Sequence, residues 1–337
     1  MTSLLFTVTF GLVIWSLTSR HADRIAALLI AVLLISAAGL RRDGYDFDNY
    51  LNLIDAVRSS SSMDVDFTYR LQSAKDPMFI WVTDLVTILN PDDHWPVFMA
   101  FAFIAVISKY IAVLSFPRYS ALFMGIYLIF LSPTLEFSGI RSAAAIGILM
   151  MVVAYPMRWE LKLPFLILSV ATHVSLILSS LISLFTCNFD RSRRGLVVLT
   201  IIIAVAAYLF SNVLNNLDRG ANYIDNKGTI FAPLFAVISS ILFTIQIWAS
   251  DKYKDDIYLN ISFIFGLSLG LSLPSIAISH RILEIGQSLF LFVMVRDLAT
   301  GIARRNRPKA VLVLTCFMGF EFLHHIYMGN WLAITIL

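Results

Sequence analysis

Arg141 is the residue of this sequence that most needs a chemical explanation. It follows Gly139 and Ile140, between two apolar segments that are each long enough to cross a bilayer. A guanidinium keeps its charge at any physiological pH, and placing one near membrane hydrocarbon costs about 2.5–3.5 kcal/mol on insertion scales. We therefore expect Arg141 to bind an anion, to pair with an acidic residue such as Glu136, or to reach water at an interface. The first option predicts an enzyme or a transporter of anionic substrates.

A dense polar group follows residue 40. Arginine side chains bind phosphate oxygens through two parallel N–H groups, aspartates accept hydroxyl protons, and tyrosine rings stack on sugars. The alternative is an arginine pair at an interface followed by a solvated acidic turn, and composition alone favours it. The group consists of Arg41, Arg42, Asp43, Gly44, Tyr45, Asp46, Asp48 and Tyr50.

Several single polar residues have a structural explanation beside a functional one. Asp76 precedes Pro77 and is expected to cap the helix that follows, whereas Arg70 is expected to be solvated. His173 lies two residues before Ser175 in an apolar stretch, where a lone histidine is usually a hydrogen-bonded core residue.

Two further groups lie nearer the C-terminus. Arg281 is expected to pair with Glu284, one helical turn away. Glu321, His324 and His325 share one helical face and have a spacing that could hold a metal ion. Because a single helix would supply every ligand, a hydrogen-bonded polar patch is favoured.

Composition predicts the class of protein that must position these residues. Hydrophobic residues make up 58% of the 337 and charged residues 14%, whereas soluble domains carry about 25% charged residues. The chain is expected to be an all-α polytopic integral membrane protein with a single transmembrane domain over residues 1–337. Its two cysteines, Cys187 and Cys316, indicate neither a disulfide framework nor a metal cluster.

Ten apolar runs are each close to the ~20 residues that a helix needs to cross the hydrocarbon. Two other stretches fit a crossing badly: 78–89 is short and contains Asp84, and 163–186 is broken near His173. We expect short or re-entrant helices there, with a hairpin over 163–186 and about 10–12 transmembrane helices in all. The ten runs lie at about 3–19, 25–40, 96–115, 119–135, 142–157, 195–213, 230–249, 257–278, 282–299 and 310–327.

The distribution of basic residues predicts the orientation. With Lys109 and Arg118 among the cytoplasmic residues, 16 of the 25 Lys and Arg residues lie inside and nine lie outside. Both termini, the long hydrophilic loop 41–77 and the turn from Glu136 to Arg141 are then external. The arginines at 41/42, 70, 141 and 281 share this outer face, which favours a phosphate or pyrophosphate ligand.

On these residues the chain resembles the EpsG/Wzy-like family of membrane polysaccharide polymerases. Such proteins show an Arg…Gly-x-Asp…Tyr pattern after an early span, an acidic-Pro-x-aromatic element, Gly-Ile-Arg, His-x-Ser and a late arginine. Asp76 and Ser142 depart from the pattern, which usually has glutamate and glutamine there. The matching residues are Arg41/Arg42 with Gly44, Asp46 and Tyr50; Asp76-Pro77-x-Phe79; Gly139-Ile140-Arg141; His173-x-Ser175; and Arg281.

The resemblance implies a glycosyltransferase with a GT-C-like architecture in the bacterial inner membrane, with its active site facing the periplasm. It would join undecaprenyl-pyrophosphate-linked repeat units for O-antigen, capsule or exopolysaccharide (lipopolysaccharide included), without metal or cofactor. Its partners would be the lipid-linked glycan donor and acceptor and membrane lipid, not nucleic acid; a chain-length regulator protein stays open.

The resemblance also implies roles for the residues. Arg141 and Arg281, with Arg41 or Arg42, would bind the pyrophosphate, and Asp46 or Asp48 would be the base. His173 would be a second base or an orienting group, and Tyr45, Tyr50 and Asp76 would contact sugar. The alternatives are a flippase for the same lipid, a glycan ligase that uses the same donor, and a non-enzymatic assembly partner.

Overall fold

The computed structural model of the chain describes residues 2–42, 46–62, 66–74, 76–137, 139–155, 157–184, 192–215, 231–300 and 306–328. Within these ranges the chain forms helices and no β-strand, so the all-helical prediction is confirmed. The helices are α1 (Thr2–Ser16), α2 (Arg20–Gly39), α3 (Phe47–Ser62), α4 (Phe67–Ala74), α5 (Pro77–Leu89), α6 (Trp95–Val113), α7 (Ser120–Phe130), α8 (Ile140–Ala154), α9 (Trp159–Thr172), the 3₁₀ turn η1 (Val174–Leu176), α10 (Ile177–Leu184), α11 (Arg193–Asn215), α13 (Phe231–Ala249), α14 (Asp256–Leu271), α15 (Ile276–Ala299) and α16 (Arg307–Met328).

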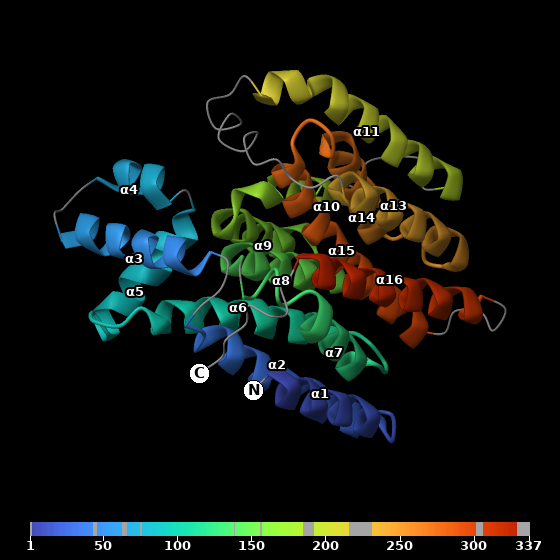
Figure 1. The fold of residues 1–337 in the computed structure, drawn as a ribbon, viewed down its shortest axis with the longest axis horizontal. Helices are drawn as coiled ribbons and strands as arrows, with labels where there is room; N and C mark the ends of the chain where they lie inside the picture. Colours follow the sequence, from blue (N-terminus) through green and yellow to red (C-terminus); the bar gives the residue numbers. More distant parts are fainter. Residues whose placement is uncertain are drawn as a thin grey trace. The chain divides into compact units, whose positions relative to one another are not determined.

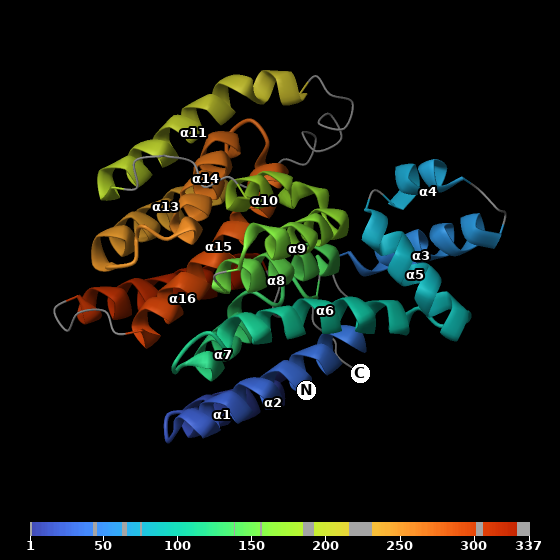
Figure 2. The same ribbon diagram turned by 180° about the vertical axis from the view of Figure 1, so that it is seen from behind.

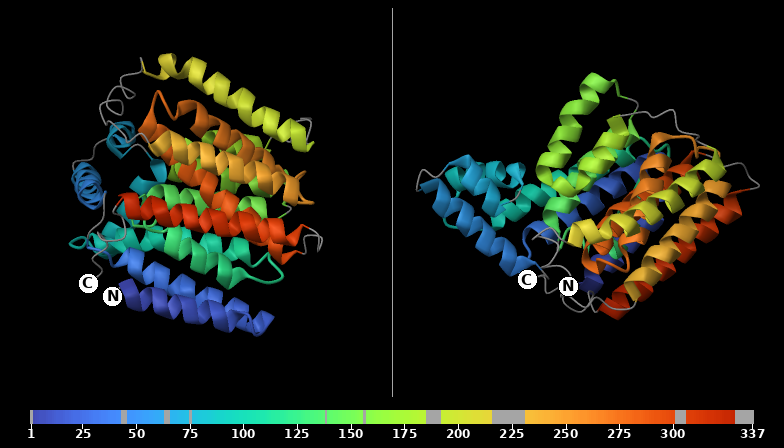
Figure 3. Two further views of the ribbon diagram at one scale, coloured as in Figure 1. Left: turned by 45° about the vertical axis from the view of Figure 1, so that its right-hand side comes forward. Right: turned by 90° about the horizontal axis from the view of Figure 1, so that it is seen from above.

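The chain divides into two compact units, which we call unit 1 (Met1–Ser180 with Glu321–Leu337) and unit 2 (Leu181–Phe320). In unit 1, α6 packs between α2 and α8, and α3, α4 and α5 form a cluster of their own (Figure 1). The view from behind shows α8 and α9 side by side (Figure 2). In unit 2, α14 packs against α11, α13 and α15 (Figure 3).

Each of the ten predicted apolar runs corresponds to a helix, although two boundaries are wrong. α7 ends at Phe130 rather than near 135, and α14 ends at Leu271, so that α15 begins at Ile276. Among the described residues, α2 and α6 are long and apolar enough to cross a membrane, and six shorter apolar helices have 10–17 residues. The number of crossings and their orientation stay predictions.

The hydrophilic stretch 41–77 is more ordered than the expected loop, because α3 and α4 occupy most of it. Polar contacts hold this cluster to α5 and to the start of α6. Arg58 donates to Thr87 Oγ1 at 3.1 Å and to the Asp93 carbonyl at 2.6 Å. Arg70 bonds to Asp84 at 2.5 Å and is only 11% exposed, so the expectation that it is solvated was wrong.

Gly147 allows α6 and α8 to pack closely. A Cβ added at Gly147 of α8 would lie 2.5 Å from the Ala105 carbonyl oxygen of α6, whereas real Cβ atoms essentially never come within 3.0 Å of such an atom. Further along both helices, the Tyr155 hydroxyl donates to the Ile111 carbonyl oxygen at 2.8 Å. Gly147 of α8 thus meets Ala105, and Tyr155, directly after α8, meets Ile111, so α6 and α8 run parallel.

Candidate functional site

Three predicted site residues from separate elements of unit 1 meet around Arg141. Asp76 directly precedes α5, Arg141 lies in the first turn of α8, and His173 directly follows α9. Arg141 Nη1 donates to Asp76 Oδ2 at 2.6 Å and to the Ala74 carbonyl oxygen at 2.9 Å. The Nδ1 atom of His173 lies 3.5 Å from the same carboxylate oxygen. The resulting Asp76–Arg141–His173 group joins residues up to 97 positions apart in the sequence.

The sequence explains why Asp76 is available to Arg141. Pro77 occupies the first turn of α5, and the residue before a proline is driven into an extended conformation; Asp76 has φ −123° and ψ 121°. It occupies the predicted N-cap position, but its side chain makes no capping hydrogen bond. The expected capping role was therefore wrong, and the carboxylate bonds to the guanidinium instead.

Aromatic rings support the guanidinium of Arg141. The rings of Tyr50 and Phe79 each have their centroid 5.4 Å from Arg141 Cζ. A ring face attracts a cation, by about 0.5–2 kcal/mol according to how far the pair is desolvated. The side chains of Arg141, Asp76 and His173 are 16%, 2% and 14% exposed, so the group is largely buried.

Arg141 retains unused donor capacity within this group. Its Nε atom is buried and has no hydrogen-bond partner among the described residues. A buried donor without an acceptor costs about 1–3 kcal/mol, and such a group calls for an explanation. An anionic ligand would supply the acceptor.

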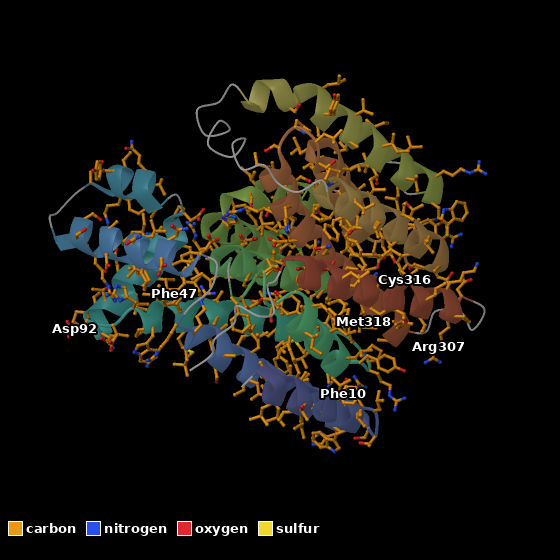
Figure 4. All side chains as sticks on the ribbon, in the orientation of Figure 1. Phe10, Phe47, Asp92, Arg307, Cys316 and Met318 are labelled. Atoms are coloured by element: carbon orange, nitrogen blue, oxygen red, sulfur yellow. The ribbon has the colours of Figure 1, made fainter. Side chains whose placement is uncertain are left out.

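Arg41 lies on a neighbouring part of the same aromatic cluster. Its Cζ is 5.0 Å from the ring centroid of Phe98, which stacks on Phe47 at 5.1 Å and meets the edge of Tyr50 at 6.2 Å. Phe47, labelled in Figure 4, is the first residue of α3. Arg41 and Arg141 are thus both held against rings of one cluster.

The local environment of Arg41 differs from that expected for a solvent-facing phosphate ligand. Arg41 is 2% exposed and its Nη1 donates to the Glu136 carbonyl oxygen at 2.8 Å, whereas Arg42 is exposed. The Glu136 carboxylate does not pair with Arg141, so that expectation was wrong. It accepts from Lys109 Nζ at 2.9 Å and from the Tyr127 hydroxyl at 2.6 Å.

Lys109 is the residue of this region that the sequence interpretation misplaced. It is counted among the cytoplasmic basic residues at the end of the run 96–115, but it is 0% exposed within α6 and pairs with Glu136. The sequence does contain a signal for a buried pair. Lys109 lies within an apolar run, and Glu136 is the single glutamate between it and Arg141.

The other predicted residues are distributed as follows. Asp46 is half-buried and accepts a weak bond from Asn49 at 3.4 Å, and Asp48 is exposed on α3. Tyr50 is 6% exposed, which favours support of Arg141 over stacking on a sugar. Tyr45 lies outside the described residues.

In unit 2, Arg281 is exposed on α15, and its convergence with Arg141 stays a prediction. Glu284 lies 3.8 Å from His280 Nδ1, an ion-pair neighbour that the sequence interpretation did not anticipate. The side chains of His324 and His325 are outside the described residues; among those described, no three His, Cys, Asp or Glu residues are grouped as metal ligands.

Comparison with known proteins gives the family. The family model for "EpsG family" matches residues 24–334, nearly the whole chain. Neither a curated protein nor a solved structure matches the chain. The match agrees with the predicted resemblance and with a helical membrane protein of polysaccharide biosynthesis. The chain belongs to the EpsG family, a Wzy-like family of polysaccharide polymerases.

Proposed function

We propose that this protein polymerises polyprenyl-pyrophosphate-linked oligosaccharide repeat units on the outer face of the bacterial inner membrane. The observation that carries the proposal is Arg141: it is fixed by Asp76 and two rings, yet keeps a buried Nε donor. A preorganised cation with a spare donor suits an anionic leaving group whose charge grows in the transition state.

The reaction would be a single glycosyl transfer. The bond between the anomeric carbon and the pyrophosphate oxygen breaks, and the oxygen of the acceptor hydroxyl forms the new bond to that carbon. The hydroxyl proton passes to a base, and the lipid pyrophosphate leaves with the bonding electrons. Arg141 would bind that leaving group, with Arg281 and Arg42 as further candidates, so that arginines supply the positive charge.

His173 is the base that the geometry favours. Its Nδ1 lies 3.5 Å from Asp76 Oδ2 and has no hydrogen-bond partner among the described residues. We expect this contact to close when substrate binds, so that the carboxylate orients the imidazole while the opposite nitrogen accepts a proton. Asp46 and Asp48 stay alternatives for this role. Asp76 would then orient both the base and the anion-binding guanidinium, rather than contact sugar.

A product ladder tests the proposal. Purified protein is incubated with the lipid-linked repeat unit without nucleotide or added metal, and the products are resolved by size. A ladder spaced by one repeat unit and lost in Arg141→Lys supports the polymerase. Folded protein that gives no ladder but moves the same lipid across proteoliposomes would make it a flippase, and transfer of finished glycan to another acceptor would make it a ligase.

The proposed orientation is tested separately. Cys187 and Cys316 are replaced by serine, and Ser61, which is exposed on α3, is replaced by cysteine. A membrane-impermeant maleimide should label Ser61→Cys once the outer membrane is opened. Labelling only after the inner membrane is also permeabilised would place α3 in the cytoplasm and refute the orientation.

A further inference from the structure

The charge pair Lys109–Glu136 lies at the core of unit 1, apart from the Asp76–Arg141–His173 group. Both side chains are 0% exposed. Lys109 Nζ donates to Glu136 Oε1 at 2.9 Å, to the Ala143 carbonyl oxygen at 2.7 Å and to the Ala105 carbonyl oxygen at 3.3 Å. An ammonium has three donors, so every donor of this lysine is used.

Glu136 belongs to a non-helical stretch between α7 and α8, within the protein interior. α7 ends at Phe130 and α8 begins at Ile140. Between them, the amide of Phe137 donates to the Ser132 carbonyl and the amide of Gly139 donates to the Thr134 carbonyl, both wider turns than an α-helix makes. Most of the described residues from 131 to 137 are buried. We call the described residues of this stretch, 131–137 and 139, the interruption.

The depth of the interruption in the membrane follows from its contact with α6. Lys109 Nζ lies beside the Ala105 carbonyl oxygen, ten residues after the start of α6 at Trp95. At 1.5 Å per residue this is about 15 Å along the helix, which is half of a ~30 Å hydrocarbon layer. In a crossing made by α6, the carboxylate of Glu136 therefore lies near mid-depth. Irregular backbone is tolerated at such depth only where protein satisfies its polar groups.

The same network connects to both arginines of the aromatic cluster. The backbone oxygen of Glu136 accepts from Arg41, and its carboxylate accepts from Lys109 and Tyr127. Lys109 also bonds to Ala143, two residues after Arg141. A shift of the interruption would therefore displace Arg41 directly and the first turn of α8, which carries Arg141.

We propose that Lys109 and Glu136 are positioning residues: their buried pair fixes the interruption and thereby sets where the Arg141 guanidinium meets the donor's phosphate. The inference rests on the proposed function, because it assumes that Arg141 binds that phosphate. Neither side chain touches substrate. Tyr127 contributes through its bond to the second carboxylate oxygen.

The test uses a double variant, because a single one leaves a buried charge unpaired. Replacing both partners by apolar residues removes the pair without an orphan charge, and such replacements are often tolerated by the fold. In Lys109→Leu with Glu136→Leu, we expect a thermal midpoint in detergent within a few degrees of wild type. The KM for the lipid-linked donor should rise at least about tenfold.

Two further variants make the test specific. Glu136→Gln keeps one carbonyl oxygen for Lys109 and turns an amide NH₂ toward the Tyr127 hydroxyl, which can accept from it. Because the buried lysine loses its counter-charge, the thermal midpoint should fall, but the KM for the donor should stay within about threefold of wild type. Asp23→Asn perturbs the other end of α7, where Asp23 accepts from the amides of Ser120 and Ala121 at 3.0 and 2.9 Å. It should lower the thermal midpoint and leave the donor KM unchanged.

The outcomes separate this inference from the proposed function. A stable double variant with wild-type KM and kcat refutes positioning, even if Arg141→Lys abolishes the ladder. If Arg141→Lys has no effect, the proposed function itself fails. Should the double variant not fold, Tyr127→Phe replaces it: a raised donor KM at an unchanged thermal midpoint supports positioning, and an unchanged KM refutes it.

Discussion

Arg141→Lys is the substitution that most directly tests the chemistry proposed here. It keeps the positive charge that faces Asp76, which is 2% exposed, and so avoids leaving a buried carboxylate unpaired. Removing one partner of a buried pair costs about 3–5 kcal/mol of folding stability, and that is the expected penalty of Arg141→Ala. The lysine variant should fold, and a loss of activity in it can be assigned to the geometry of the guanidinium.

The size of the effect follows from the contacts that lysine cannot reproduce. Arg141 holds Asp76 and Ala74 through Nη1, lies against two rings and retains Nε for a ligand. An ammonium offers a single point of attachment and cannot bind phosphate with a planar fork. Loss of one preorganised donor to a developing anion costs about 2.7–4 kcal/mol, and each 1.36 kcal/mol is roughly tenfold in rate. We expect a fall in kcat of about 100- to 1,000-fold.

The assay compares Arg141→Lys with Arg58→Lys in the polymerisation reaction. Arg58 is a suitable control because it bonds to Thr87 and to two carbonyl groups at the far end of α5. Arg58→Lys loses hydrogen bonds of a half-buried guanidinium and should lower the folding stability by about 1 kcal/mol. It should change kcat by less than about threefold. Arg141→Lys with full kcat would refute a role for the planar guanidinium.

Three other substitutions test the surroundings. Asp76→Asn keeps an oxygen for Arg141 but removes the charge beside His173; kcat for polymerisation should fall about 10- to 100-fold, and an unchanged rate would exclude the pair as base and orienter. Gly147→Val would place Cβ 2.5 Å from the Ala105 oxygen, so the thermal midpoint and activity should both fall; Gly11→Val, which meets no atom within 4 Å, is the neutral control. Asp23→Ala should destabilise the fold by about 2–4 kcal/mol, because two α7 amides lose a charged acceptor; denaturation in detergent measures the change, and wild-type stability would contradict the capping role.

The helices could be predicted from the sequence because their signal is local. Apolar runs of nearly the length of a crossing correspond to helices in every case, and the break before Ser175 coincides with the end of α9 at Thr172. Boundaries failed where the apolar character outlasts the helix: Leu131 and Leu135 are buried but not helical. The amphipathic helices α3 and α4 were missed because their mean polarity resembles that of a loop.

The partners of the charged residues could not be predicted, because they are set by tertiary structure. For Arg141 the sequence offers Glu136, five residues away, as an acidic partner, but the guanidinium bonds to Asp76, 65 residues away. Arg70 is expected to be solvated, but it pairs with Asp84 of the next helix. In a low-dielectric interior a charge must find an opposite charge or hydrogen bonds, and the helix packing decides which residue supplies them.

The two buried groups of unit 1 differ in how completely their donors are used, and this difference predicts how each responds to mutation. All three donors of Lys109 are bonded to protein, so removing its charge alone leaves Glu136 unpaired and should first reduce stability. Arg141 donates through Nη1 to Asp76 and to the Ala74 carbonyl oxygen, and its buried Nε has no partner among the described residues. A change that preserves its charge should therefore spare the fold and reduce activity. The reasoning would be refuted if Lys109→Met kept the wild-type thermal midpoint while Arg141→Lys lowered it. The number of hydrogen bonds that a buried cation makes to protein would then not separate a structural charge from a functional one.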